Sequence, residues 1–207
     1  MKTIGIVGGI AWPSSLFFYK AINEYFKDRT QSNGLHTPNL ILAQTNFALI
    51  EEAQSEGNWD DVGRLLAGEA ANLKAAGADL FLLACNTLYT ADEYIIKHSE
   101  LPMLHIVDAT ANKVVQRGYK TVGLLGSRYT ITGAYFADRL KKKNNLKVLV
   151  ADGVHARNVH NALYQELAKN IFLPETRTKF KAAMEALVAR GAEIVVLGCT
   201  EFGMLVK

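Results

Sequence analysis

The sequence contains one short pattern twice, and this duplication limits the folds that the chain can adopt. Residues 3–8 (TIGIVG) are echoed by residues 121–126 (TVGLLG). Residues 77–85 (GADLFLLAC) are likewise echoed by residues 191–199 (GAEIVVLGC), and each of these segments ends in one of the two cysteines of the chain. Because order, spacing and the terminal cysteine agree in both halves, we predict a duplicated structural unit.

Short apolar runs alternate with longer amphipathic ones. The apolar runs are rich in Ile, Leu and Val, as parallel strands covered on both faces are. A helix is predicted over residues 14–27, with Ser14 as its N-terminal cap. The expected strands are residues 3–8, 39–46, 80–85, 103–108, 121–126, 147–152 and 193–199. This pattern predicts an α/β protein with two pseudo-symmetric parallel-sheet (Rossmann-like) lobes, residues 1–99 and 100–207, with the active site between them at the strand carboxyl ends.

Composition excludes several classes of protein. Hydrophobic residues make up 49% of the chain, charged residues 21%, and the net charge is only +3, without a basic stripe that would bind nucleic acid. The apolar runs are too short to cross a membrane. Two distant cysteines favour free thiols in a reducing cytoplasm over a disulfide or a zinc site, and His155 and His160 lack a third metal ligand. We therefore expect a cytoplasmic protein with no nucleic-acid partner, no membrane segment and no metal.

Two free thiols at equivalent strand ends suggest a specific chemistry. Inverting an amino acid at Cα requires a base that removes the proton on one face and an acid that returns one on the other. Cys85 and Cys199 would serve if their sulfurs stood on opposite sides of one carbon, roughly 7–9 Å apart. Small turns rich in hydroxyl and amide groups follow both cysteines, namely Asn86-Thr87 and Thr200-Glu201. Such turns suit a carboxylate, on which charge accumulates as the proton leaves.

Several motifs resemble those of the aspartate/glutamate racemase family, and the resemblance covers essentially the whole chain. The cysteine motifs are residues 84–87 (ACNT) and 198–201 (GCTE), and the latter resembles aspartate racemases more than glutamate racemases, which usually carry His in place of Glu201. The further matches are residues 4–9 (IGIVGG), 46–51 (NFALIE), 104–110 (LHIVDAT), 126–130 (GSRYT) and 163–167 (LYQEL).

The resemblance implies a racemase that acts on an amino acid without a cofactor. It implies that Cys85 and Cys199 are the two bases. The substrate-binding residues that it implies are Ile10, Gln54, Asn86, Thr87, Thr130 and Thr200. Separately, we expect the protein to be a homodimer.

Some residues depart from the family pattern and leave the preferred amino acid open. Tyr89 stands where the family commonly shows His, Asn158 stands where relatives that bind a side-chain carboxylate often carry Lys, and no Arg lies near Gln54. Glu201 is either a partner of the site or simply an acid in the first turn of a helix. Alternative functions are a cysteine-dependent isomerase, decarboxylase or hydantoin racemase of the same superfamily, and a catalytically idle amino-acid-binding protein.

The two halves also differ after their cysteines. Cys85 is followed by a helical stretch and a further apolar run, whereas only eight residues follow Cys199. By analogy with the first half, we expect the natural product to continue for roughly two dozen residues beyond Lys207.

Overall fold

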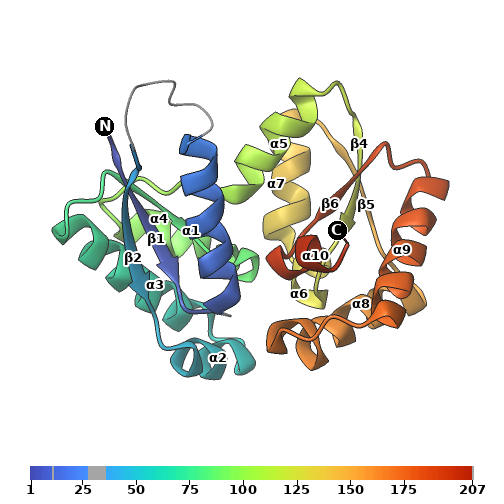
Figure 1. The fold of residues 1–207 in the computed structure, drawn as a ribbon, viewed down its shortest axis with the longest axis horizontal. Coiled ribbons are helices and arrows are strands. Elements are labelled where there is room, and N and C mark those ends of the chain that lie inside the picture. The colour runs from blue at the N-terminus through green and yellow to red at the C-terminus, as the bar shows by residue number, and fades with distance from the viewer. Residues whose placement is uncertain (11, 28–35, 207) are drawn as a thin grey trace. The chain divides into compact units, whose positions relative to one another are not determined.

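The computed structural model describes residues 1–10, 12–27 and 36–206. The chain divides into two compact units, Met1–His105 and Ile106–Lys207. The sequence predicts the boundary six residues earlier, after residue 99. Each unit contains a three-stranded parallel sheet (Figure 1), which confirms the predicted α/β class with two similar lobes. Among the described residues, no helix is long and apolar enough to cross a membrane.

The first unit contains a sheet in the order β2-β1-β3. Its elements in chain order are β1 (Thr3–Gly8), α1 (Trp12–Lys27), β2 (Asn39–Gln44), α2 (Phe47–Ser55), α3 (Trp59–Ala75), β3 (Leu80–Leu83), the short 3-10 helix η1 (Asn86–Ala91) and α4 (Asp92–His98).

The second unit contains a sheet in the order β5-β4-β6. Its elements are α5 (Ile106–Gln116), β4 (Thr121–Leu125), α6 (Arg128–Thr132), α7 (Ala134–Asn144), β5 (Lys147–Val150), α8 (Gly153–Gln165), the 3-10 helix η2 (Leu167–Lys169), α9 (Pro174–Ala189), β6 (Ile194–Leu197) and α10 (Thr200–Leu205).

The central strands β1 and β4 pair with the cysteine-bearing strands in the same register. Ile4 lies opposite Leu80 in the first sheet, and Val122 lies opposite Ile194 in the second. These pairs occupy matching positions of the repeat, so the duplication seen in the sequence extends to the hydrogen-bonded register. A shift by one residue would turn every side chain of a strand to the opposite face.

An acidic residue fixes this register in each unit. The carboxylate of Asp79 accepts a hydrogen bond from the Thr3 N–H at 2.6 Å, and the Asp79 N–H donates to the Thr3 carbonyl at 2.9 Å. Glu193 makes the same two bonds with Thr121, at 2.6 and 3.0 Å, and its carboxylate also accepts from the Lys120 N–H at 2.7 Å. The acid of the repeated Gly-Ala-acid triplet therefore joins the start of the cysteine-bearing strand to the start of the central strand.

The glycine of each triplet ends the preceding helix. Gly77 and Gly191 have φ values of +94° and +98°, which residues with a side chain rarely adopt. The residue after each glycine donates its N–H to a carbonyl in the last turn of the helix, from Ala78 to Leu73 and from Ala192 to Leu187. This is the hydrogen bonding of a Schellman-type helix end, and it turns the chain directly into the strand.

Helices cover both faces of each sheet. In the first unit, Ile6 and Leu82 pack against Phe18 of α1, while Gly5 on the other face leaves room for Leu73 of α3. In the second unit, α5 and α7 cover one face of the sheet, where Val114, Leu124 and Phe136 are buried. Helices α8 and α9 cover the other face, where Leu125, Val159 and Phe180 are buried. Apolar side chains on both faces explain why the strands are near-continuously apolar.

Two predictions about local structure are wrong. Residues 103–108 are not a strand: Met103 makes a single bridge to Phe81, and α5 begins at Ile106. Of the apolar residues that suggested a strand, Met103 and Leu104 precede that helix. Val107 belongs to its buried face, where Val107, Ala111 and Val114 follow helical spacing. Ser14 is not a cap either, because α1 begins at Trp12 and Ser14 is buried within it. The other predicted strands are present, and several end one or two residues earlier than expected.

Tyr89 ties the segment after α4 to the end of β3. Its side chain is fully buried, and its hydroxyl accepts the Leu83 N–H at 3.2 Å and donates to the Leu104 carbonyl at 3.1 Å. Its ring packs on His105 at 4.4 Å between centroids, and His105 Nε2 lies 3.3 Å from the buried carboxylate of Asp92. Tyr89 therefore packs behind the end of β3.

The hydrogen bonds to the Glu193 carboxylate predict how the stability of the protein changes with pH. Hydrogen bonds from the N–H groups of Lys120 and Thr121 lower the pKa of Glu193 from its ordinary value of 4.5. A lowered pKa in the folded state stabilises the protein above the ordinary value, and this contribution is lost as the pH falls through the folded pKa. Glu193→Gln should therefore lower the urea midpoint at neutral pH, and the difference from the parent should shrink toward about pH 3. Glu185→Gln, which removes an exposed carboxylate of α9 near Lys181, serves as control. A pH-independent difference would contradict the assignment.

The Tyr89 hydroxyl should contribute measurably to stability. Tyr89→Phe keeps the ring but leaves the buried N–H of Leu83 without this acceptor, so we expect unfolding free energy to fall by about 1–3 kcal/mol in urea denaturation. Tyr94→Phe is the matched control, because Tyr94 stacks on His98 and lies only partly buried. Equal effects of the two variants would argue against a special role for the Tyr89 hydroxyl.

Candidate active site

Cys85 lies just beyond the carboxyl end of β3 and immediately precedes η1. Its backbone is extended, with φ −150° and ψ 124°, and its side chain is half-buried. Asn86 and Thr87 form the first turn of η1, and the Thr87 carbonyl accepts a hydrogen bond from the Thr90 hydroxyl at 2.8 Å. The chain therefore turns sharply at Cys85 and places it beside donor side chains.

Cys199 occupies the equivalent place in the second unit. It follows β6, immediately precedes α10, is half-buried, and has φ −147° and ψ 142°. These angles differ from those of Cys85 by less than the usual scatter within one conformation. The duplication thus extends to the backbone conformation of both cysteines.

The surroundings of Cys199 include a buried carboxylate. Glu201 is 3% exposed, and its Oε2 accepts hydrogen bonds from Cys199 Sγ at 2.8 Å and from Thr200 Oγ1 at 2.7 Å. Of the two interpretations of Glu201 left open by the sequence, this geometry supports a partner of the cysteine. The sequence placed Glu201 two residues after Cys199 but could not show which way its side chain points.

Thr130 is placed against the Cys199 loop but is almost fully buried, at 1% exposed. Its hydroxyl lies 3.1 Å from Ser127 Oγ and accepts from the Tyr135 hydroxyl at 3.3 Å. A Cβ added to Gly198 would lie 3.1 Å from Thr130 Cγ2 and 2.9 Å from the Leu125 carbonyl oxygen. Glycine at position 198 therefore allows Thr130 to pack closely behind the residue that precedes Cys199.

The turn after β1 forms another part of the strand carboxyl edge in the first unit. Gly9 has φ +91°, and its N–H donates to Ser15 Oγ at 2.9 Å, while Ile10 is buried. The backbone of Thr45, just beyond β2, approaches so closely that a Cβ on Gly9 would lie 2.3 Å from the Thr45 carbonyl oxygen. Thr45 is not among the predicted site residues, and its buried Oγ1 has no hydrogen-bond partner among the described residues. The predicted strand over residues 39–46 included Thr45, whereas β2 ends at Gln44 and leaves Thr45 just beyond the strand.

The predicted site residues fall into two groups, each within one unit. In the first unit, Ile10, Cys85, Asn86 and Thr87 follow β1 or β3 at the carboxyl edge of the sheet, and Gln54 lies half-buried on α2, the helix after β2. In the second unit, Cys199 and Thr200 follow β6, and Thr130 lies on α6 after β4. Parallel strands present their carboxyl ends at one edge, where α/β proteins usually bind ligands.

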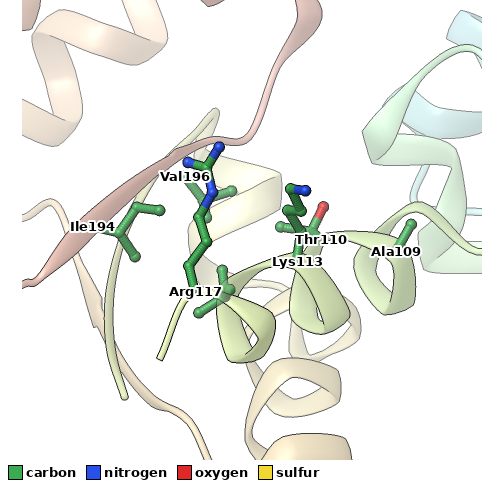
Figure 2. Close-up of a pocket in the computed structure, with 7 residues that line it drawn as sticks. Ala109, Thr110, Lys113, Arg117, Ile194 and Val196 are labelled. Carbon is green, nitrogen blue, oxygen red and sulfur yellow. The ribbon is translucent and has the colours of Figure 1, made fainter. Parts of the chain in front are cut away.

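A separate pocket of about 340 Å³ lies in the second unit beside the edge strand β6 (Figure 2). In Figure 2, Arg117, which follows the last residue of α5, reaches toward Val196 of β6. The lining residues are Ala109, Thr110, Lys113, Val114, Arg117, Ile194 and Val196. None of them belongs to the predicted site. In the first unit, the corresponding edge of β3 carries the bridge to Met103, whereas β6 pairs only with β4 among the described residues.

The chain is similar to known proteins along nearly its whole length. A family model described as Asp/Glu/Hydantoin racemase matches residues 7–207. The broad specificity amino-acid racemase RacX of Bacillus subtilis is 26% identical over 199 residues, which cover 96% of this chain and 85% of that protein. A glutamate racemase of Deinococcus radiodurans is 29% identical over 155 residues, which cover 70% of this chain and 50% of that protein.

Two solved structures are similar along all of this chain. A Yersinia pestis protein described as an Asp/Glu racemase superposes with a TM-score of 0.92 and 34% identity, covering 100% of this chain and 89% of that one. An aspartate racemase homologue from Pyrococcus horikoshii superposes with a TM-score of 0.84 and 30% identity, with the same coverage of each chain. Sequence and fold therefore agree that this chain belongs to the Asp/Glu/hydantoin racemase family.

Proposed function

We propose that the protein is an amino-acid racemase in which Cys85 and Cys199 act on opposite faces of one substrate Cα. The observation that carries this proposal is the equivalence of the two cysteines: each follows the edge strand paired in the same register with the central strand, and each has nearly the same backbone angles. Membership of the racemase family supports it. Racemisation connects two mirror-image amino acids, so it needs one acid/base group on each face of Cα.

At the start of the proposed reaction, one cysteine is a thiolate and the other is a thiol. The thiolate of one cysteine takes the Cα proton and becomes a thiol, and the electron pair left on the substrate spreads into its carboxylate. The other cysteine donates its thiol proton to the opposite face of Cα and becomes a thiolate. The product is the other enantiomer, and the cysteines have exchanged protonation states. Exchange of one proton between the cysteines, through solvent, resets the protein.

The substrate carboxylate needs donors that act as its negative charge grows. We assign this role to Asn86, Thr87 and the backbone N–H of Thr200, which lie beside the two cysteines in the turns after β3 and β6. The hydroxyl of Thr200 already donates its proton to Glu201. Ile10 and Gln54 are proposed to line the same pocket. Thr130 is proposed to support the site through the Cys199 loop, because its hydroxyl is already bonded to protein groups.

The proposed substrate is an acidic amino acid or a broader set of amino acids. Tyr89, one of the departures from the family pattern, is buried and bonded to backbone, so it acts through packing. Asn158 lies half-buried on α8 and is neutral where relatives that bind a side-chain carboxylate often carry Lys, which favours broad specificity. RacX is named a broad specificity amino-acid racemase, and the P. horikoshii protein is named a homologue of aspartate racemase, so both choices are compatible with the names of the relatives. The homodimer expected from the sequence stays a prediction.

Deuterium wash-in at Cα tests the proposal directly. A panel of L- and D-amino acids is incubated with the protein in deuterated water, and loss of the α-proton signal is followed by NMR. Cys85→Ser and Cys199→Ser should each lower racemisation by roughly 10²- to 10⁴-fold, because a hydroxyl is too weak an acid to replace a thiol at neutral pH. Circular dichroism checks that both variants remain folded.

The outcomes separate the competing functions. Undiminished racemisation by either serine variant would exclude the two-thiol mechanism. Binding of amino acids in calorimetry, without exchange by the parent protein, would indicate a binding protein. Turnover of a hydantoin, which the family description also includes, or of an unsaturated diacid in place of amino acids would reassign the substrate within the superfamily.

A further inference from the structure

The two candidate catalytic thiols share a backbone conformation but differ in the charge of a residue close by. Two residues after Cys85 stands Thr87, a neutral hydroxyl, whereas two residues after Cys199 stands Glu201, a carboxylic acid. Both residues lie in the first turn of the short helix that each cysteine precedes. The duplication therefore supplies an internal comparison, in which the residue two positions after the cysteine is the main chemical difference.

Glu201 is fixed in contact with Cys199. Its Oε2 lies 2.8 Å from Cys199 Sγ, and the bond from Thr200 Oγ1 at 2.7 Å holds the same oxygen in place. Two contacts anchor the helix that carries Glu201, both beyond Glu201 along the chain: Phe202 packs edge-on against Phe180 of α9, and Arg177 Nε donates to the Leu205 carbonyl at 2.7 Å. Glu201 is 3% exposed, so bulk water does not screen the pair strongly.

The charges of such a pair are coupled. If both Cys199 and Glu201 were ionised, two negative charges would face each other within hydrogen-bond distance in a poorly hydrated place, and like charges at that distance oppose double ionisation. One shared proton removes the repulsion and makes the hydrogen bond. A carboxylic acid is ordinarily far more acidic than a thiol, so the shared proton belongs on sulfur.

We propose that Glu201 keeps Cys199 protonated in the free protein, so that Cys199 starts as the proton donor and Cys85 as the base. The protonation of Cys199 by itself concerns only the free protein. The roles of Cys199 as donor and Cys85 as base rest on the proposed racemase function. In that first half-reaction, the Cys85 thiolate gains the Cα proton and Cys199 gives up its thiol proton to the opposite face. Glu201 accepts the hydrogen bond of that thiol proton in the free protein, and the S–H turns from Glu201 toward Cα before the proton is donated. Glu201 does not touch the substrate, and it acts as a positioning residue through Cys199.

Alkylation of the two thiols tests the proposal without any substrate. Iodoacetamide reacts with the thiolate and not the thiol, and peptide mass spectrometry measures the rate at each cysteine separately. In Glu201→Gln, which keeps the shape and an acceptor oxygen but removes the charge, the rate at Cys199 should rise by about tenfold or more, because the thiolate no longer faces a carboxylate. The rate at Cys85 should not change. Glu201→Asp, which keeps the charge, should stay closer to the parent.

Glu185→Gln is the control for removal of a carboxylate from the same unit. It takes away an exposed carboxylate of α9 near Lys181 and should change neither rate. An unchanged rate at Cys199 in Glu201→Gln would overturn the proposal. A lower rate would overturn it as well and would show that Glu201 instead withdraws the proton from Cys199. A protein that fails to racemise can still show the expected alkylation rates, so failure of the proposed function and failure of this inference are distinguishable.

Discussion

The arrangement of both sheets depends on a pair of hydrogen bonds made by one acidic residue just before each cysteine-bearing strand, one through its carboxylate and one through its backbone N–H. Asp79 and Glu193 each bind both the N–H and the carbonyl of the threonine that begins the neighbouring central strand. This fixes the register between the two strands at their amino ends. Because strands have a constant rise per residue, a register set at one end also sets where the chain leaves the sheet at the other. The position of each cysteine follows from that.

Much of this arrangement could be predicted from the sequence. The repeated triplets, the apolar runs and the cysteines at their ends are local features, and they indicated the parallel sheets and the strand that carries each cysteine. The predicted strand over residues 103–108 failed because a short apolar run fits a strand and the buried face of a helix equally well. Ser14 failed as a cap because the helix begins earlier, at Trp12. Such choices are settled by tertiary packing, which local periodicity does not contain.

The site was less predictable than the fold. Residue type and position relative to a strand made Cys85 and Cys199 candidates, but the direction of a side chain depends on contacts that are distant in sequence. Thr130 is buried because Gly198, which is far along the chain, leaves space for it. Glu201 turns toward sulfur and not toward solvent in a helix whose far end is held by Arg177. Both facts depend on packing between segments that no local motif connects.

An unequal pair of thiols leaves the equilibrium between enantiomers unchanged, since mirror-image amino acids have equal free energies in water. The values of kcat/KM for the two enantiomers must then be equal. If Cys199 is the resting donor, the enantiomer whose Cα–H faces Cys85 meets the protein in its reactive protonation state. The other enantiomer meets a form in which the Cys199 thiolate faces Glu201, and its apparent affinity falls by the small fraction of that form. A higher KM for that enantiomer requires a proportionately higher kcat. The carboxylate of Glu201 therefore governs how each direction saturates and not which direction is favoured.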